Sequence, residues 1–192
     1  MQTNSLVYTD KAAARRELAR IRAEIPDVKS YSDELCRRIA LLDEYKSADT
    51  LLLYFPTRSE PDLSSLALAA WQDGKQVAFP ISKTDSLTLD FRIVNTLDEL
   101  NEGAYGIFEP SESSEIAIFS KNSLCIVPAL AVDLDGYRLG YGKGYYDRFL
   151  ASFEGAAVIA LHSSLVCEYL PRLKTDIPIK TIITETGATL LK

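Results

Sequence analysis

The sequence predicts an α/β fold in which a mainly parallel β-sheet is layered between helices on both of its faces. Segments with the helical spacing of apolar residues alternate along the chain with short, continuous apolar runs. Such runs are typical of strands that are covered on both faces. A glycine-rich segment at residues 138–148 lies between one apolar run and one amphipathic segment, in the order strand, loop, helix. Because strands that alternate with helices usually pair in parallel, we expect a single layered domain over residues 1–192.

The first expected helix spans residues 10–25 and stops at Pro26, since proline cannot continue a helix. Its apolar face consists of Ala14, Leu18, Ile21 and Ile25. At 100° per residue, three of its basic side chains form a stripe that borders this face, and Arg16 and Arg20 point the opposite way. The stripe consists of Lys11, Arg15 and Arg22. It either leans over a site beside the core or belongs to a solvated helix held by i,i+4 pairs.

The remaining elements follow from the same two patterns. Helices are expected at residues 32–45, at residues 61–73 before Gly74, and after the glycine-rich segment, where Tyr146, Phe149, Leu150 and Phe153 share one face. Residues 106–110 are expected to form a loop. Strands are expected at residues 50–55, 76–80, 87–93, 124–132, 157–161 and 180–184.

The bulk composition excludes several classes of protein. The chain has 192 residues, of which 47% are hydrophobic and 25% charged, as in a globular domain with a substantial core. The net charge of −6 argues against nucleic acid as a main partner, since phosphate backbones favour a basic surface. No apolar run is long enough to span a bilayer, so we expect no membrane partner.

Cysteine and histidine usage points to the cytoplasm and away from zinc. Cys36, Cys125 and Cys167 are scattered without the spacing of a metal site or a disulfide framework. His162 is the only histidine, which makes a zinc site improbable. The first five residues lack the basic and apolar parts of a signal peptide. We therefore expect a cytoplasmic protein, and we expect it to be a monomer.

The glycine-rich segment is the strongest indication of function. Alternating glycines let the backbone approach a ligand and point several N–H groups at one place, and the N-terminus of the following helix favours anions. Lys143 adds a mobile positive charge for a phosphate, and Asp147 could hold the Mg²⁺ that accompanies nucleotide phosphates. The spacing matches neither the dinucleotide fingerprint nor the P-loop. The plainer interpretation is a turn with a solvated lysine and a helix-capping aspartate.

Three loops follow expected strands. They are the glycine-rich segment, the loop at residues 55–60 and the loop around Glu109. Ligands of open α/β sheets bind beyond the carboxyl ends of the strands. We therefore expect the three loops to face one crevice.

Taken together, these motifs resemble the 5-formyltetrahydrofolate cyclo-ligase family, also called 5,10-methenyltetrahydrofolate synthetases, over nearly the whole chain. The resemblance begins with Lys11 and Arg15 as K-x-x-x-R and continues with Tyr54-Phe55-Pro56 and Glu60. It then includes Phe79-Pro80, GIFEP at residues 106–110, Val127-Pro128, the glycine loop with YYDR, Asp176 and Thr184-Glu185. The glycine loop is the most specific of these motifs.

The resemblance implies an enzyme that uses MgATP to convert 5-formyltetrahydrofolate to 5,10-methenyltetrahydrofolate, with release of ADP and phosphate. Implied ATP-binding positions are Lys11, Arg15, Arg138, Leu139, Gly140, Tyr141, Gly142, Lys143, Gly144, Tyr145 and Tyr146. Implied folate-binding positions are Phe55, Glu60, Gly140, Tyr141, Gly142, Lys143 and Gly144. Asp147 and Asp176 match Mg²⁺ ligands. Lys143, Tyr141 and Arg138 are the expected catalytic residues, with Tyr141 near the formyl group.

The implied chemistry explains which residues are missing. Transfer of the γ-phosphoryl group to the formyl oxygen would give an iminium phosphate, which N10 attacks as the ring closes and phosphate leaves. Phosphoryl transfer requires positioning and charge neutralisation more than a protein nucleophile. This agrees with a chain that offers no Ser/His/Asp or Cys/His arrangement.

Several positions depart from the family pattern. Ala129 and Val132 replace a glycine and a phenylalanine, Leu165 stands where glutamine is common, Thr175 precedes Asp176, and His162 takes an often aromatic position. Alone, Glu60 and Asp176 would be a solvated loop charge and a turn residue, and Trp71 would be a packing residue. Two alternatives to the cyclo-ligase stay open: a non-catalytic folate or nucleotide binder, and a different small-molecule kinase or ligase.

Overall fold

The computed structural model describes residues 4–103 and 106–191; residues 1–3, 104–105 and 192 of the expected domain lie outside this description. Its larger sheet has seven strands: β2 (Thr50–Leu52), β3 (Gln76–Lys83), β4 (Thr88–Ile93), β7 (Ser123–Val127), β10 (Ala156–Ala160), β12 (Thr181–Thr184) and β13 (Gly187–Leu190). Their spatial order is β13-β12-β10-β7-β2-β3-β4. The inner strands pair in parallel from β12 to β3. The two edge pairs, β12 with β13 and β3 with β4, are antiparallel.

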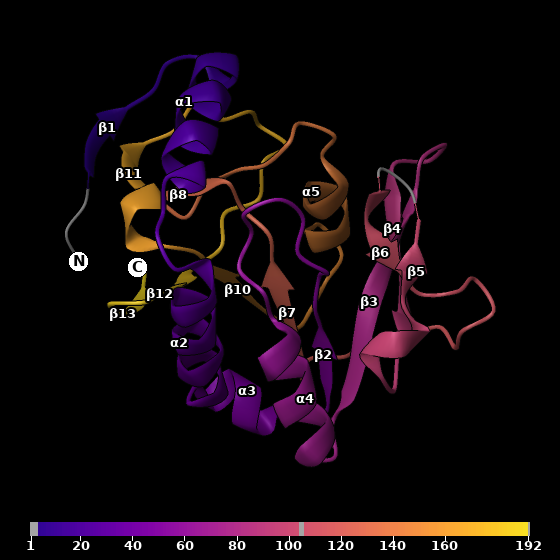
Figure 1. Ribbon diagram of the computed structural model, residues 1–192. Helices are drawn as coiled ribbons and strands as arrows, with labels where there is room; N and C mark the ends of the chain where they lie inside the picture. Colours follow the sequence, from indigo (N-terminus) through magenta and orange to yellow (C-terminus); the bar gives the residue numbers. More distant parts are fainter. Residues whose placement is uncertain (1–3, 104–105, 192) are drawn as a thin grey trace.

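A second sheet lies beside the first (Figure 1). It consists of β1 (Asn4–Val7), β8 (Ala131–Asp133), β9 (Arg138–Leu139) and β11 (Val166–Tyr169), in the order β1-β11-β8-β9. The pairs β1 with β11 and β11 with β8 are parallel, and β8 with β9 is antiparallel. A small antiparallel pair joins β5 (Asn101–Glu102) to β6 (Phe108–Glu109).

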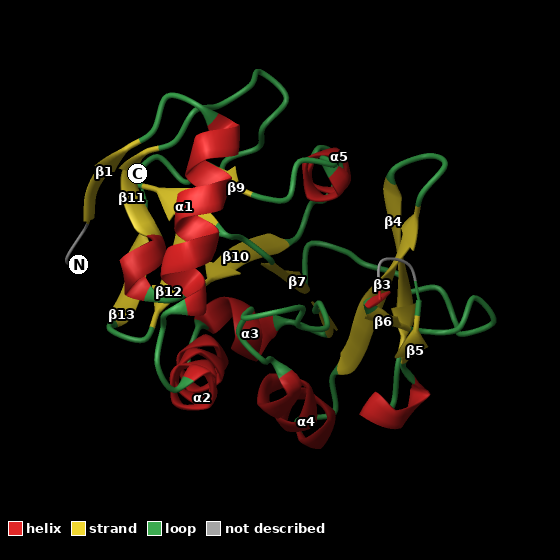
Figure 2. Cartoon of the chain, turned by 45° about the horizontal axis from the view of Figure 1, so that its top comes forward, coloured by secondary structure: helices red, strands yellow, loops and turns green. Residues whose placement is uncertain are grey.

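The helices lie on two sides of the strands. They are α1 (Lys11–Ala23), α2 (Val28–Ala40), α3 (Asp43–Ser47), α4 (Ser64–Gln72) and α5 (Tyr145–Leu150), with 3₁₀ turns at Leu97–Glu99 and Ser163–Leu165. Figure 2 shows α2, α3 and α4 below the strands and α5 above them. The α/β class and the mainly parallel sheet flanked by helices are thus confirmed. Within residues 4–103 and 106–191, even the longest helices have 13 residues, and none is long and apolar enough to cross a bilayer.

The first helix forms as expected. The Asp10 carboxylate caps it by accepting a hydrogen bond of 2.6 Å from the amide of Ala13, which satisfies one of the unpaired donors at a helix start. Ala14 and Leu18 are fully buried on its apolar face. Arg22 is buried as well, which places one member of the basic stripe inside the protein.

The predicted helix at residues 32–45 is two helices. The first begins earlier, because Asp27 caps it at the amide of Ser30 with its own backbone in the left-handed region. It ends at Ala40, and the extended backbone of Leu42 starts α3. The helix expected at residues 61–73 starts at Ser64 and ends at Gln72, just before Gly74, whose φ is 73°.

Two apolar runs are shorter strands than expected. In the run at residues 50–55 only Thr50–Leu52 pairs, although Leu53 and Tyr54 stay buried. The run at residues 124–132 divides at Pro128 into β7 and β8, which belong to different sheets. Proline has no N–H for a central ladder, so the chain leaves the larger sheet there.

Other differences concern short strands. Part of the loop expected at residues 106–110 pairs as β6, and the strand expected at residues 76–80 continues to Lys83. The sequence did not predict β1, β11 or β13, each of four residues. Segments this short carry too few positions for a period of two to stand out.

Candidate active site

The glycine loop, which we define as residues 140–144, joins β9 to α5. Gly142 has φ 97° and Gly144 has φ 70°, a left-handed conformation that costs other residues about 1–2 kcal/mol. A Cβ atom on Gly142 would lie 3.1 Å from Nη2 of Arg15. The predicted order of strand, loop and helix is confirmed, but the strand directly before the loop is β9, an edge strand of the smaller sheet, and not the apolar run at residues 124–132.

The basic stripe of α1 lies against this loop and its surroundings. Arg15 donates from Nε to the carbonyl oxygen of Gly140 at 2.7 Å. Lys11 forms an ion pair of 2.6 Å with Asp176. Arg22 forms a hydrogen bond with Tyr141, the residue after Gly140 in the loop. Of the two interpretations of the stripe, the structure therefore supports the one in which it leans over a site.

Tyr141 of the glycine loop is held by two guanidinium groups. Arg22 donates from Nη2 to its phenol oxygen. The guanidinium of Arg58 lies 5.4 Å from its ring centre, within cation–π range. Arg58 has φ 54°, so a strained backbone conformation aims this side chain across the site. Tyr141 is still 47% exposed and can meet a ligand.

Glu60 is buried beneath the same group of side chains. Its Oε2 accepts hydrogen bonds of 2.9 Å from the backbone N and Oγ1 of Thr57. Its Oε1 lies 3.8 Å from Nη1 of Arg22. Burial raises the pKa of this carboxyl above its ordinary value, although the Thr57 hydrogen bonds and the charges of Arg22 and Arg58 oppose the rise.

The loop around Glu109 also reaches the loop at residues 55–60. The rings of Phe55 and Phe108 lie 5.1 Å apart between centroids. Glu109 itself is buried and accepts a hydrogen bond of 3.0 Å from the amide of Ser82. These contacts, together with those of Tyr141, link all three expected loops. Glu109 is hydrogen-bonded to β3, and its role there is structural.

Arg138, Asp147 and Asp176 form a second polar group behind the glycine loop. Arg138 donates to Oδ1 of Asp147 at 2.9 Å and to the carbonyl of Ile177 at 3.0 Å. The amide of Ile177 donates to the same Oδ1 at 3.1 Å. Asp176 accepts at Oδ2 from Lys11 and from the amide of Leu173. Asp147 therefore contacts Ile177, the residue that follows Asp176, and this contact brings the two expected Mg²⁺ ligands into the same region.

The two carboxylates fit part of a Mg²⁺ site. In the described part of the chain, Oδ2 of Asp147 and Oδ1 of Asp176 have no hydrogen-bond partner. Among residues 4–103 and 106–191, no group of three or more histidine, cysteine or acidic residues is arranged so that it could hold a metal ion by itself. Mg²⁺ bound with a nucleotide commonly takes one or two carboxylates and fills its shell with phosphate oxygens and water. Asp147 and Asp176 therefore fit a metal that arrives with a nucleotide.

The remaining expected residues differ in what they can offer a ligand. The Lys143 side chain is exposed and has no partner among the residues that the structure describes. Leu139 is 1% exposed, so only its backbone could face a nucleotide. Tyr145 and Tyr146 are half-buried in the first turn of α5. Burial raises the pKa of the Tyr146 phenol well above its ordinary value, so this group is a neutral hydrogen-bonding group.

The departures from the family pattern have different structural consequences. Leu165 is 1% exposed and packs in the core. Ala129 and Val132 are also buried, which agrees with a variation in packing. Thr175 is exposed in the turn before Asp176.

His162 lies at the end of β10 and contacts polar groups there. Its Nε2 is 3.5 Å from Oε1 of Glu185, and its Nδ1 lies 2.9 Å from Oγ of Ser164. Its ring meets that of Tyr31 edge to face, with 5.3 Å between centroids. Tyr31 in turn donates to the carbonyl of Ser59, next to Glu60. His162 therefore lies at the border of the site, just after a strand, and both of its ring nitrogens have polar neighbours.

Three residues at the site were not among those expected to bind a ligand: Arg22, Arg58 and Phe108. Arg22 carried a signal, since it belonged to the basic stripe, and Phe108 is part of the GIFEP motif. Arg58 carried none, because its place depends on a left-handed backbone that sequence spacing does not reveal.

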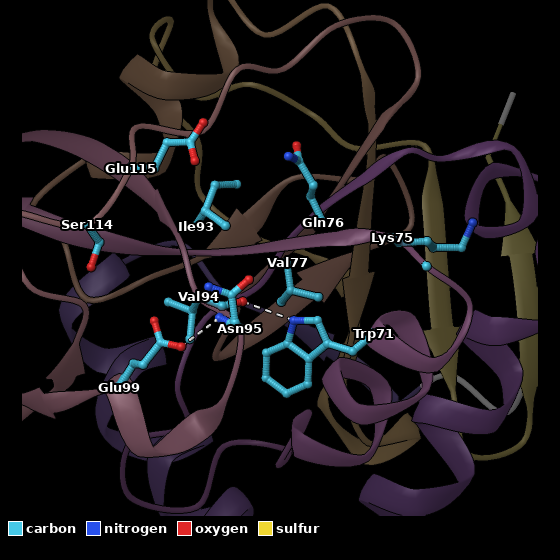
Figure 3. A pocket seen from close by; sticks show the side chains of 11 residues that line it. Trp71, Lys75, Gln76, Val77, Ile93, Val94, Asn95, Glu99, Ser114 and Glu115 are labelled. Carbon is cyan, nitrogen blue, oxygen red and sulfur yellow. Dashed lines mark hydrogen bonds between the residues drawn. The ribbon is translucent and has the colours of Figure 1, made fainter.

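A separate pocket of about 300 Å³ lies near Trp71, close to the start of β3 (Figure 3). The indole N–H of Trp71 donates to the carbonyl of Val94 at 2.9 Å, which supports its expected packing role. None of the expected ligand-binding residues lines this pocket. It begins at the amino end of β3, whereas Glu60 follows the carboxyl end of β2.

Comparison with known proteins identifies the family of this chain. The sequence model of the 5-formyltetrahydrofolate cyclo-ligase family matches residues 7–185. The chain belongs to that family. A 5-formyltetrahydrofolate cyclo-ligase of Escherichia coli K12 is 30% identical over 142 residues, which cover 71% of this chain and 78% of the relative. Its counterpart in Haemophilus influenzae is 25% identical over 177 residues, or 88% of this chain and 94% of the relative.

The cyclo-ligase family resemblance extends to solved structures. The NMR structure of a 5,10-methenyltetrahydrofolate synthetase from Aquifex aeolicus has a TM-score of 0.82 at 31% identity, and the match covers 95% of this chain and 93% of that one. The synthetase structure from Mycoplasma pneumoniae has a TM-score of 0.71 at 20% identity, over 92% and 99% of the two chains, and shows the same fold. The predicted family is thus confirmed.

Proposed function

We propose that residues 1–192 act as one cyclo-ligase domain that converts 5-formyltetrahydrofolate and ATP to 5,10-methenyltetrahydrofolate, ADP and phosphate. The observation that carries the proposal is the convergence of the basic stripe, the glycine loop and Glu60 at one place. Arg15 contacts the loop at Gly140, and Arg22 contacts it at Tyr141. Family membership and the names of the relatives support the choice of substrate.

In this proposal the nucleotide lies against the glycine loop. Backbone N–H groups and Lys143 bind its phosphates, as Lys11 and Arg15 do from α1. Lys143 is exposed and has no competing carboxylate in the described part of the chain, so it can follow the γ-phosphoryl group during transfer. Mg²⁺ bound with the nucleotide would neutralise phosphate charge, and Asp147 and Asp176 are the residues that would hold it.

The folate would lie on the other side of Tyr141. Glu60 and Phe55 would bind the pterin end, with the formyl group near the Tyr141 phenol. The γ-phosphoryl group passes to the formyl oxygen, N10 attacks the activated carbon, and phosphate leaves with that oxygen as the ring closes. Arg138, Lys143 and Tyr141 orient the reacting groups and stabilise their charge.

The protein needs no nucleophile for this reaction, and its cysteines are poorly suited to be one. All three are buried. Burial raises the pKa of Cys36 to about 11 and that of Cys167 to about 12, and it raises the pKa of Cys125 as well. At neutral pH these thiols are protonated, and the thiolate is the reactive form.

A spectrophotometric assay tests the proposal. The protein is mixed with 5-formyltetrahydrofolate and MgATP, and the near-ultraviolet absorption of the methenyl product is followed. Growth of that band only when ATP and Mg²⁺ are both present is the expected result. A folded protein that is stabilised by both ligands but gives no band would be a binder. ATP consumption with another substrate and none with this folate would indicate a different kinase or ligase.

A further inference from the structure

Arg22 is a buried charge that connects two loops of the site. Its side chain is 4% exposed, whereas Arg16 and Arg20 on the opposite face of α1 are exposed. Nη2 donates to the phenol oxygen of Tyr141, which is 119 residues away in the chain. Nη1 lies 3.8 Å from Oε1 of Glu60.

The contact with Glu60 leaves Arg22 with unused hydrogen-bonding capacity. A distance of 3.8 Å is too long for a hydrogen bond. Nη1 has no hydrogen-bond partner among the residues that the structure describes. Burial of an unsatisfied guanidinium N–H is costly. Because the whole side chain is buried, Arg22 acts through its contacts with Glu60 and Tyr141 and not by direct contact with a ligand.

The shape of the side chain explains why it can serve both loops. A guanidinium group is planar and offers several donors in a fixed fork, whereas an ammonium group is a single point charge. One Arg22 can therefore set the distance between the Glu60 carboxylate and the Tyr141 phenol. Arg58 lies over the same tyrosine ring, but it is exposed and has no ion pair in the described ranges.

We propose that Arg22 is a positioning residue for the folate side of the site, holding Glu60 of one loop and Tyr141 of the other in register for the substrate. This inference rests on the proposed function. It predicts that Arg22 affects binding of 5-formyltetrahydrofolate much more than binding of ATP, because the nucleotide lies against Lys11, Arg15 and Lys143.

Loss of Arg22 has a defined electrostatic consequence for Glu60. The Arg22 charge lowers the pKa of this carboxyl, against the larger effect of burial. Without it, the carboxylate keeps the Thr57 hydrogen bonds but loses its buried cation, so its pKa rises further. The titratable and charged groups that face Glu60 are Arg22 of α1, Arg58 of its own loop, Tyr31 of α2, Tyr54 after β2, and Tyr146 of α5.

The test compares Arg22→Met, which keeps the length and removes the charge, with Arg22→Lys and with the matched control Arg16→Met. Arg16 lies on the exposed face of the same helix. In Arg22→Met the KM for 5-formyltetrahydrofolate should rise about tenfold or more, and the KM for ATP should change less than about twofold. The acidic limb of the kcat/KM profile should move to higher pH. Arg22→Lys should restore that limb but leave part of the KM defect.

Two results would overturn the inference. The first is an Arg22→Met enzyme with the folate KM and acidic limb of the Arg16→Met control. The second is an equal fall in kcat/KM for both substrates with no shift of the acidic limb, which is what a general loss of structure produces. A carboxyl NMR titration of Glu60 in the same variants gives a reading that does not need turnover. Wild-type protein that makes no product would refute the proposed function, and the same titration would still show whether Arg22 controls Glu60.

Discussion

At the residue scale, the cations of the site fall into two groups. Lys11, Arg15, Arg22 and Arg138 are already bound to carboxylates, a carbonyl or a phenol, which fixes their positions before any ligand arrives. Lys143 is exposed and has no partner in the described ranges. Fixed charges favour positioning, and a free ammonium group can follow a moving phosphoryl group.

This difference predicts the effect of Lys143→Ala. The substitution should lower kcat/KM for ATP roughly a hundredfold, as loss of one group that stabilises a transition state commonly does. The free energy of unfolding should stay within about 0.5 kcal/mol, because the side chain is exposed. Steady-state kinetics and denaturant unfolding measure the two effects. Lys121→Ala, at another exposed lysine, is the control, and equal activity of the two variants would contradict the role of Lys143.

Glu60 predicts a pH dependence of stability. Its pKa is raised in the folded protein, so the folded state binds the proton more tightly than the unfolded state does. The contribution of Glu60 to stability is therefore largest below the unfolded pKa, near 4.5, and falls as the pH rises toward the folded pKa. Wild type should lose stability relative to Glu60→Gln across that window in urea unfolding from pH 4 to 8.

The Thr57 hydroxyl provides a matched variant for this prediction. It donates to Oε2 of Glu60 at 2.9 Å, which favours the charged carboxylate. Thr57→Val should raise the folded pKa further and extend the loss of stability to higher pH. If wild type instead gained stability relative to Glu60→Gln as the pH rose, the folded pKa of Glu60 would be lowered, against the prediction.

At the element scale, the sequence predicted most helices and the buried strands. It did not predict which strands pair with one another, and therefore which sheet each strand joins. The apolar run at residues 124–132 looks like one strand, yet Pro128 sends its two halves to different sheets. Apolar spacing shows that a segment is buried but not which neighbour it pairs with. The contact between the stripe of α1 and the glycine loop was easier to anticipate than the sheet arrangement, because each of the two segments carries a local signal in the sequence. Arg58 carried no such signal.

The turn between β8 and β9 needs a glycine at position 136. Gly136 lies in this turn with φ 85°, and a Cβ atom there would lie 2.3 Å from the carbonyl oxygen of Ile179. Its own carbonyl accepts a hydrogen bond of 2.9 Å from the amide of Ile179. This turn places β9, and therefore the start of the glycine loop.

Gly136→Ala should lower the free energy of unfolding by at least about 2 kcal/mol, because it adds left-handed strain to a backbone clash. Its kcat should fall too, as β9 shifts. Gly187→Ala is the control, since Gly187 has no neighbour within 4 Å of the added atom and no positive φ. Chemical denaturation compares the two, and equal stability would mean that the turn relaxes without cost.

At the scale of the whole molecule, the site joins segments that are distant in the sequence. Lys11 of α1 binds Asp176, and Arg22 of the same helix lies between Glu60 and Tyr141. The first helix therefore ties the smaller sheet, through β9 and its loop, to the loop that leaves β2 of the larger sheet. A ligand held by the same side chains would reinforce contacts that join both sheets.

This arrangement predicts that MgATP stabilises the entire fold and not the loop alone. At a hundred times its Kd, a ligand that binds only the folded state adds about 2.7 kcal/mol to the free energy of unfolding. Thermal unfolding should therefore shift upward as a single transition with MgATP, much less with ATP and EDTA, and little with Mg²⁺ alone, because two carboxylates are a small part of a Mg²⁺ shell. Asp147→Asn should reduce the MgATP shift toward that of ATP with EDTA, whereas Lys121→Ala should keep the full shift. An equal shift with and without EDTA would show that the metal does not take part in nucleotide binding, and Asp147 would then act only as the partner of Arg138.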